Sequence, residues 1–174
     1  MSRARLVRRY HPIMAEVAVR PLVDTDRDWV AHLIAERWGA EIVVAHGVVY
    51  RPVELAGFAA EDGDGGVLGL VTYVLADEAC EVVTLDSMTE GRGVGTALLA
   101  AVGEVAREHG CSRIWLITTN DNLHALGFYQ RRGYELVAVH RGAVAHSRRL
   151  KPAIPLVGAG GIPLRDELEL ELRL

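Results

Sequence analysis

Apolar side chains follow two spacings along the chain, and each spacing predicts a different kind of element. Between residues 29 and 38 they recur every three or four positions, as on one face of a helix: Trp29, Val30, Leu33, Ile34 and Trp38. Asp24 or Thr25 can cap this helix, and Gly39 can end it. A second helix is predicted from 97 to 109 by the stripe Val94, Leu98, Val102 and Val105.

Short apolar runs bounded by turn residues predict the strands. They cover residues 17–21, 55–60, 67–75, 80–85, 114–118 and 134–140, with two extended segments around Gly47 between 41 and 50. The acidic turn Glu61–Gly66 joins 55–60 to 67–75 as a hairpin. Residues 168–174 alternate strictly between leucine and charged residues, which predicts a half-exposed strand and offers an edge for dimer formation.

Composition bounds the chain to one domain. With 174 residues, half of them apolar, it can bury one substantial core. The domain is expected over 15–174. Residues 1–14 are expected to be a flexible leader, and Met14 could be the true start. The net charge is −4 and the basic residues are scattered, so no nucleic-acid footprint is expected. No apolar run reaches about 18 residues, which favours a cytoplasmic protein and no membrane partner. Cys80 and Cys111 lie in apolar surroundings and predict buried free thiols, with no metal site.

The glycine-rich segment Glu90–Thr96 follows a predicted strand directly and opens the helix at 97–109. Such a junction aims free backbone N–H groups and the positive end of the helix at one spot, which suits a phosphate. It is neither a Walker A sequence nor a dinucleotide fingerprint, because no Gly-Lys-Ser/Thr follows and Thr96 stands where a third glycine would be. Taken alone, a tight turn is the simpler interpretation.

A second segment favours the phosphate-binding interpretation over the tight turn. Asn122, Ala125 and Tyr129 lie on a short predicted helix that follows the strand 114–118 and is closed by Gly133. Together the two segments, within Val67–His140, resemble the GNAT superfamily of acetyl-CoA-dependent N-acetyltransferases. The resemblance implies a mixed α/β fold, with a mostly antiparallel central sheet, helices on both faces and a splay between the two middle strands. One departure is Glu90, where the family usually has Gln or Arg.

The resemblance also implies a site for acetyl-CoA. Main-chain groups of Leu85 and Ser87 would pair with the pantetheine, and Asn122 begins the helix that lies along it. The pyrophosphate would lie on the loop and first helical turn, formed by Gly91, Arg92, Gly93, Val94, Gly95 and Thr96.

Three side chains are candidates for proton transfer. Tyr129 stands at the position of the family's thiolate-protonating tyrosine, and a phenol is a suitable donor. Glu81 and Asp86 are the candidate bases; their odd separation along a strand predicts that they lie on opposite faces, so that only one faces the cleft. His124 and His140 are better explained as surface or satisfied residues, and Arg131 and Arg132 as a solvated helix end.

These observations favour an N-acetyltransferase that moves acetyl from the thioester directly to a primary amine of a small molecule, with a peptide, protein or aminoglycoside amine as subordinate acceptors. The alternatives are a non-catalytic acyl-CoA-binding regulatory domain, and a structural interaction domain that binds no CoA. A homodimer is compatible with each.

Overall fold

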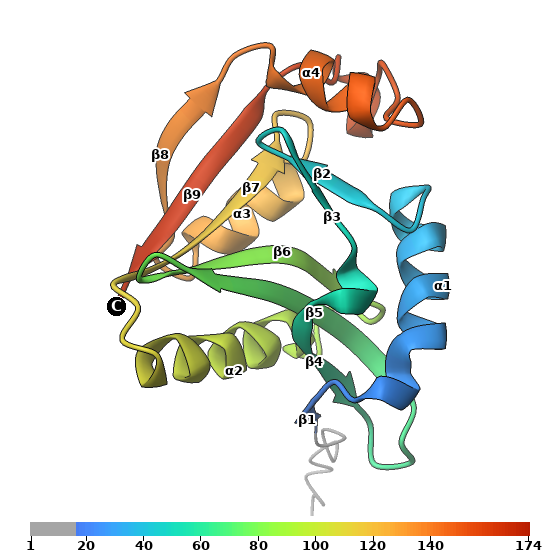
Figure 1. Cartoon of the computed structure of the whole chain (residues 1–174), viewed down its shortest axis with the longest axis vertical. Helices are drawn as coiled ribbons and strands as arrows, with labels where there is room; N and C mark the ends of the chain where they lie inside the picture. Colours follow the sequence, from blue (N-terminus) through green and yellow to red (C-terminus); the bar gives the residue numbers. More distant parts are fainter. Residues whose placement is uncertain (1–16) are drawn as a thin grey trace, which may run out of the picture.

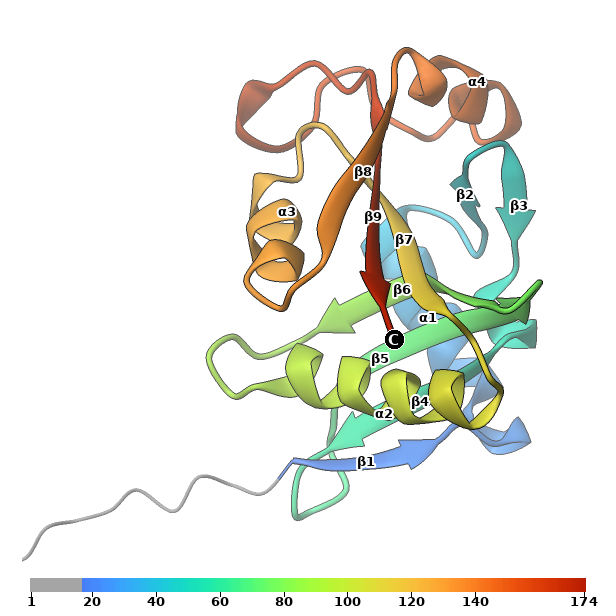
Figure 2. The same ribbon diagram turned by 90° about the vertical axis from the view of Figure 1, so that its left-hand side faces the viewer.

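The computed structural model describes residues 17–174, so the leader expected at 1–14 lies outside the described residues. Seven strands form one sheet in the order β1-β4-β5-β6-β7-β9-β8, in which only β6 and β7 are parallel (Figures 1 and 2). A separate hairpin pairs β2 with β3. The strand bounds are β1 Ala18–Pro21, β2 Val43–Ala45, β3 Val48–Tyr50, β4 Ala56–Glu61, β5 Val67–Ala76, β6 Ala79–Ser87, β7 Arg113–Thr119, β8 Glu135–His140 and β9 Glu167–Arg173.

Helices cover both faces of the sheet. Helix α1 (Arg27–Trp38) packs on one face, with the β2–β3 hairpin beside it and α4 (Ala143–Leu150) against β2. Helices α2 (Val94–Glu108) and α3 (Leu123–Gln130) pack on the other face, in the larger core (Figure 2). This arrangement confirms the fold class expected from the sequence. No helix in residues 17–174 is long and apolar enough to cross a membrane.

The splay expected between the middle strands is present. β6 and β7 pair only from Ala79–Val82 to Arg113–Leu116. Beyond that point β6 continues to Ser87 beside β5, and β7 continues to Thr119 beside β9. The two strands therefore open as a V from their shared start (Figure 1).

A bulge in β6 corrects the predicted placement of the two carboxylates. Thr84 pairs with Thr72 but Val82 pairs with Tyr73, so Val83 is one extra residue in β6. Glu81 then lies opposite Val74 and Asp86 opposite Leu70, an even separation on β5. Both carboxylates consequently face the side of α1 and the β2–β3 hairpin, and the expectation of opposite faces was wrong.

The start of α1 also differs from the prediction. A 3₁₀ turn, Asp24–Asp26, precedes the helix, and neither Asp24 nor Thr25 caps it. The buried Asp26 instead accepts hydrogen bonds from Arg20, from the Val23 backbone and from the Trp29 indole. The predicted end is confirmed, because Gly39 adopts a left-handed conformation with φ of 73°.

The C-terminal strand does not provide a sheet edge. β9 lies between β7 and β8 and pairs with both, so it is an internal strand and the dimer edge expected there was wrong. Its leucines face the larger core, and the alternate residues Glu167 and Glu171 are also buried. The prediction of a half-exposed strand fails because the β2–β3 hairpin and α4 cover this face.

Candidate active site

A cavity of about 680 Å³ lies at the open side of the V, between the end of β6, the glycine loop and α3. The residues that the sequence assigned to acetyl-CoA line it, apart from Arg92: Leu85, Ser87, Gly91, Gly93, Val94, Gly95, Thr96 and Asn122. Tyr129 and Asp86 line it as well, whereas Glu81 does not. The structure therefore brings the predicted loop, pantetheine and acid residues together in one cavity.

The glycine loop depends on backbone conformations that L side chains rarely adopt. Gly91 and Gly93 have φ of 75° and 74°, and a Cβ at either position would meet open space. Gly93 is the N-cap of α2 and supplies no side-chain cap, so the N–H groups of the first turn stay available. This 15-residue helix thus presents free donors and the positive end of its dipole to the cavity.

Helix α3 braces the loop from the other side. A Cβ on Gly95 would lie 2.9 Å from the Phe128 ring, so only glycine allows this approach. Arg132 lies 3.5 Å above the same ring and donates to the Thr96 hydroxyl at 2.6 Å. Burial, together with repulsion from Arg131, lowers the pKa of Arg132. Both arginines line the cavity, whereas the sequence favoured a solvated helix end.

Tyr129 is buried in the cavity wall, with 8% of its surface exposed. Its hydroxyl has no hydrogen-bond partner in residues 17–174. Every fully buried side-chain oxygen in this range does have a partner, so the Tyr129 hydroxyl is not fully buried and opens to the cavity. Burial, and then the neighbouring Tyr134 and Asp86, raise the pKa of Tyr129. The phenol is therefore fully protonated at neutral pH, which is the form that a proton donor needs.

Asp86 stands in the same wall and is held from α1. The Trp38 indole donates to its Oδ2 at 3.0 Å. Burial raises the pKa of Asp86, and the Trp38 hydrogen bond and the Arg37 charge oppose this rise. Trp38 entered the sequence analysis only as an apolar position of the helix, since its spacing gave no sign of a polar contact.

Glu81 lies deeper, next to the vertex of the V. Its Oε1 is 2.8 Å from His46 Nε2, and its Oε2 accepts the Tyr50 hydroxyl at 2.7 Å. Neither partner was predicted from the sequence. The turn at Gly47 was foreseen, but nothing in the pattern indicates the face on which that hairpin packs.

Some of the remaining candidates line the cavity and others lie outside it. His124 and Glu90 line the cavity, so Glu90 remains at the loop despite its departure from the family pattern. His140 lies outside it and contacts Glu169 at 2.9 Å. Cys80 and Cys111 are buried free thiols, as predicted.

The sequence of residues 24–134 matches the model of the acetyltransferase (GNAT) family, and the chain belongs to this family. It is accordingly an acetyl-CoA-dependent N-acetyltransferase. The uncharacterized protein YxbD of Bacillus subtilis is 43% identical to it over 150 residues, which cover 86% of this chain and 94% of the relative.

Solved structures share the fold. An IAA acetyltransferase from Bacillus cereus superimposes with a TM-score of 0.70 at 20% identity, covering 91% of this chain and all of that one. A Bacillus subtilis acetyltransferase in complex with CoA gives a TM-score of 0.65 at 18% identity, covering 91% and 99%.

Proposed function

We propose that the protein transfers an acetyl group from acetyl-CoA directly to the primary amine of a small molecule, with the cavity beside the β6–β7 V as the acetyl-CoA site. The observation that carries the proposal is the convergence of the left-handed glycines, the α2 N-terminus and Tyr129 on that cavity. The CoA complex of the structural neighbour supports the same cosubstrate.

The loop and α3 would hold the phosphates. The first-turn N–H groups of α2 supply donors, and Arg131 and Arg132 add positive charge to the wall. The pantetheine would run along β6, whose edge beyond Val82 is not paired with β7. Six residues separate Ser87 from Glu81, about 20 Å of strand, so an arm extended along β6 brings the thioester close to Glu81.

The chemistry needs a base for the amine and an acid for the thiolate, both beside the thioester. The acceptor arrives as an ammonium ion, gives one proton to Glu81, and attacks the thioester carbonyl as a neutral amine. A C–N bond forms and the carbonyl electrons move to oxygen, where free N–H groups of β6 stabilise the charge. When the C–S bond breaks, sulfur keeps the electron pair and takes the Tyr129 proton; the tyrosinate recovers a proton from the acylated nitrogen. Glu81 finally releases its proton to solvent.

Asp86 is the competing base, because it faces the same side and burial raises its pKa. The structure favours Glu81, since it lies where the extended arm ends. Comparing Glu81→Gln with Asp86→Asn separates them: we expect Glu81→Gln to lower kcat by about 10²-fold or more, with Asp86→Asn changing kcat by less than tenfold. The reverse order would make Asp86 the base.

Calorimetric titration with acetyl-CoA tests the site, followed by a thiol-release screen over an alkylamine, a diamine, an amino acid, a peptide and an aminoglycoside. Gly93→Glu places a carboxylate in the proposed phosphate site and should abolish binding. Gly65→Glu is the matched control, because Gly65 is also left-handed and open but lies in the β4–β5 turn. Unchanged binding in Gly93→Glu would refute the site, and binding without amine-dependent thiol release would indicate a non-catalytic acyl-CoA-binding protein.

A further inference from the structure

Glu81 differs from most of the buried acidic side chains in having no arginine or lysine beside it. Within residues 17–174, five acidic residues are buried: Asp26, Glu81, Asp166, Glu167 and Glu171. Three of them, Asp26, Asp166 and Glu171, pair with arginines. Within residues 17–174, neither Glu81 nor Glu167 has an arginine or lysine within 4.0 Å; both contact His46 instead. A buried carboxylate without a cation is costly unless hydrogen bonds compensate it.

Both oxygens of Glu81 are satisfied by the β2–β3 hairpin. The Tyr50 hydroxyl donates to Oε2, so the hydrogen on the other contact must come from His46, because a carboxylate only accepts. His46 therefore carries a hydrogen on Nε2. The same nitrogen lies 3.0 Å from the Tyr50 oxygen, which closes a three-membered network around the carboxylate.

His46 is held through both its backbone and its ring. It has φ of 40° in the hairpin turn, and its backbone N–H donates to Glu167 Oε2 at 2.9 Å. The other oxygen of Glu167 accepts the Ser147 hydroxyl from α4 at 2.6 Å. The Trp115 ring packs against the imidazole with centroids 5.1 Å apart. Elements far apart in the chain thus converge on one residue.

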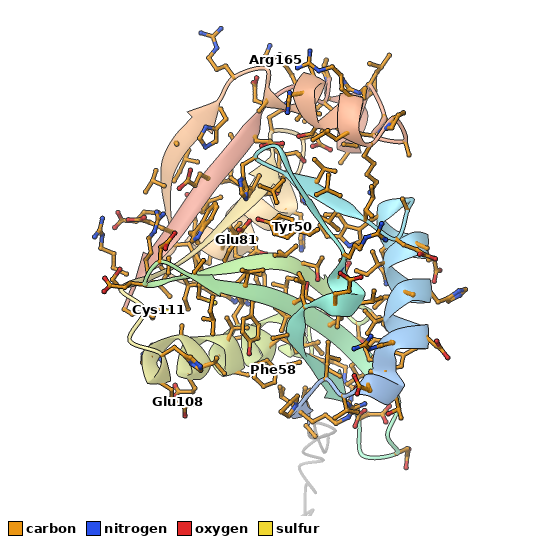
Figure 3. The ribbon with its side chains drawn as sticks, viewed as in Figure 1. Tyr50, Phe58, Glu81, Glu108, Cys111 and Arg165 are labelled. Carbon is orange, nitrogen blue, oxygen red and sulfur yellow. The ribbon has the colours of Figure 1, made fainter. Side chains whose placement is uncertain are left out.

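The network lies at the vertex of the V. Glu81 pairs with Trp115 in the β6–β7 ladder, and the next pair, Val82 with Leu116, is the last before the strands separate. Figure 3 shows Tyr50 reaching from the hairpin toward Glu81 at this point.

We propose that His46 and Tyr50 are positioning residues for the transfer reaction: they hold Glu81 ionised and oriented toward the incoming ammonium group. The inference rests on the proposed function, because it names the residues that position the base of that reaction. Hydrogen bonds to the charged form of a carboxylate favour that form. Without them, the buried carboxylate would lose both hydrogen-bond partners and its fixed direction.

Other charged groups face the same region. On β5 the residue opposite Glu81 is the uncharged Val74. The titratable side chains on this face of the surrounding elements include His46 and Tyr50 from the hairpin, His146 from α4, Asp86 from β6, Arg113 from β7, His140 from β8, and Glu167, Glu169 and Glu171 from β9. Arg113 pairs with Glu171 at 2.8 Å and lies 3.5 Å from Glu169, so its charge is balanced by these two carboxylates and not by Glu81.

The first test needs no turnover. Carboxyl-¹³C NMR of glutamate-labelled protein reports on the hydrogen bonds of the Glu81 carboxylate, whose signal is assigned by its disappearance in Glu81→Gln. We expect Tyr50→Phe to shift this signal at pH 7, since one hydrogen bond to the carboxylate is lost. Tyr73→Phe is the matched control and should leave it in place, because Tyr73 is a buried tyrosine on the opposite face, stacked on Phe58. An unmoved Glu81 signal in Tyr50→Phe would overturn the inference.

The second test measures kcat with butylamine, and the Kd of acetyl-CoA, in each variant. Tyr50→Phe should lower kcat about tenfold, with the acetyl-CoA Kd unchanged. His46→Leu should lower kcat similarly, and His46→Gln, which retains an N–H donor, should recover most of it. An unchanged kcat in Tyr50→Phe, or a His46→Gln variant no better than His46→Leu, would overturn the positioning role. Absence of turnover by the wild type with butylamine and with all the screened amines would refute the proposed function, whereas the NMR result would stand.

Discussion

At the scale of single residues, the charge of Asp86 affects the proton of Tyr129 across the cavity wall. Burial raises the pKa of both Tyr129 and Asp86, and the Asp86 charge adds to the rise at Tyr129. Negative charge on the phenol is thus disfavoured while Asp86 is ionised. The arrangement suits a donor that keeps its proton until a thiolate forms beside it.

We expect Tyr129→Phe to lower kcat by about 10²-fold and to leave the acetyl-CoA Kd within a factor of two, because only the donor is removed. Thiol release gives kcat and calorimetry gives Kd. Tyr134→Phe controls for loss of a buried hydroxyl, since Tyr134 packs against Tyr129 without lining the cavity. Equal rates in Tyr129→Phe and wild type from pH 6 to 10 would show that another group protonates the thiolate.

The two buried cysteine thiols should not react in the thiol-release assay. Cys80 has no exposed surface, and burial, followed by the charges of Cys111 and Glu81, raises its pKa to about 12. A thiol in this state is a poor nucleophile. The folded protein should consume no aromatic disulfide reagent at pH 8 within the assay time, and two equivalents after denaturation. Rapid labelling of the native protein would mean that the core around β6 opens readily.

At the scale of elements, the effect of the glycine loop on acetyl-CoA binding can be separated from its effect on the stability of the fold. Gly93→Ala and Gly65→Ala each force an alanine into the left-handed region without a clash, and should lower the free energy of unfolding by about 1 kcal/mol. Only Gly93→Ala should weaken acetyl-CoA binding, because Gly93 directs the first turn of α2. Urea unfolding and calorimetry on the same samples measure both quantities. Equal loss of binding in the two variants would assign the effect to stability alone.

Sequence patterns located most elements because their spacing and glycine boundaries are local. The cavity residues were predicted from the resemblance to the GNAT family, whose two motifs are each local in sequence: Leu85 to Thr96 form one strand–loop–helix junction, and Asn122 to Tyr129 one short helix. The bulge at Val83 could not be predicted, since its register depends on pairing with β5. His46, Tyr50 and Trp38 join the carboxylates across 35, 31 and 48 residues of sequence, and no local periodicity encodes such distances.

At the scale of the whole molecule, acid should destabilise the protein partly through Asp26. Arg20 holds the pKa of this carboxyl well below its ordinary range, with further lowering by the Val23 and Trp29 hydrogen bonds. A depressed folded-state pKa contributes stability that is present above the unfolded value, about 3.9, and is lost as pH falls through the folded value.

The difference in unfolding free energy between wild type and Asp26→Asn should therefore be largest near neutrality and shrink steadily below pH 4. Urea unfolding at a series of pH values measures it. Asp24→Asn is the control, because Asp24 is exposed and pairs only with the exposed Arg27. A difference that does not change with pH would show that Asp26 acts through its hydrogen bonds and not through its charge.

The place of β9 between β7 and β8 has a consequence for how the chain folds as it is made. β8 joins the sheet only through β9, although it precedes it by 27 residues in the chain. While residues 167–173 are still inside the ribosome, β7 has a free edge and β8 has no neighbour in the sheet. The V can form early, but the face that carries the Glu81 network closes only when these residues emerge. Chaperones that recognise unpaired strands therefore have a defined interval in which to bind the nascent chain.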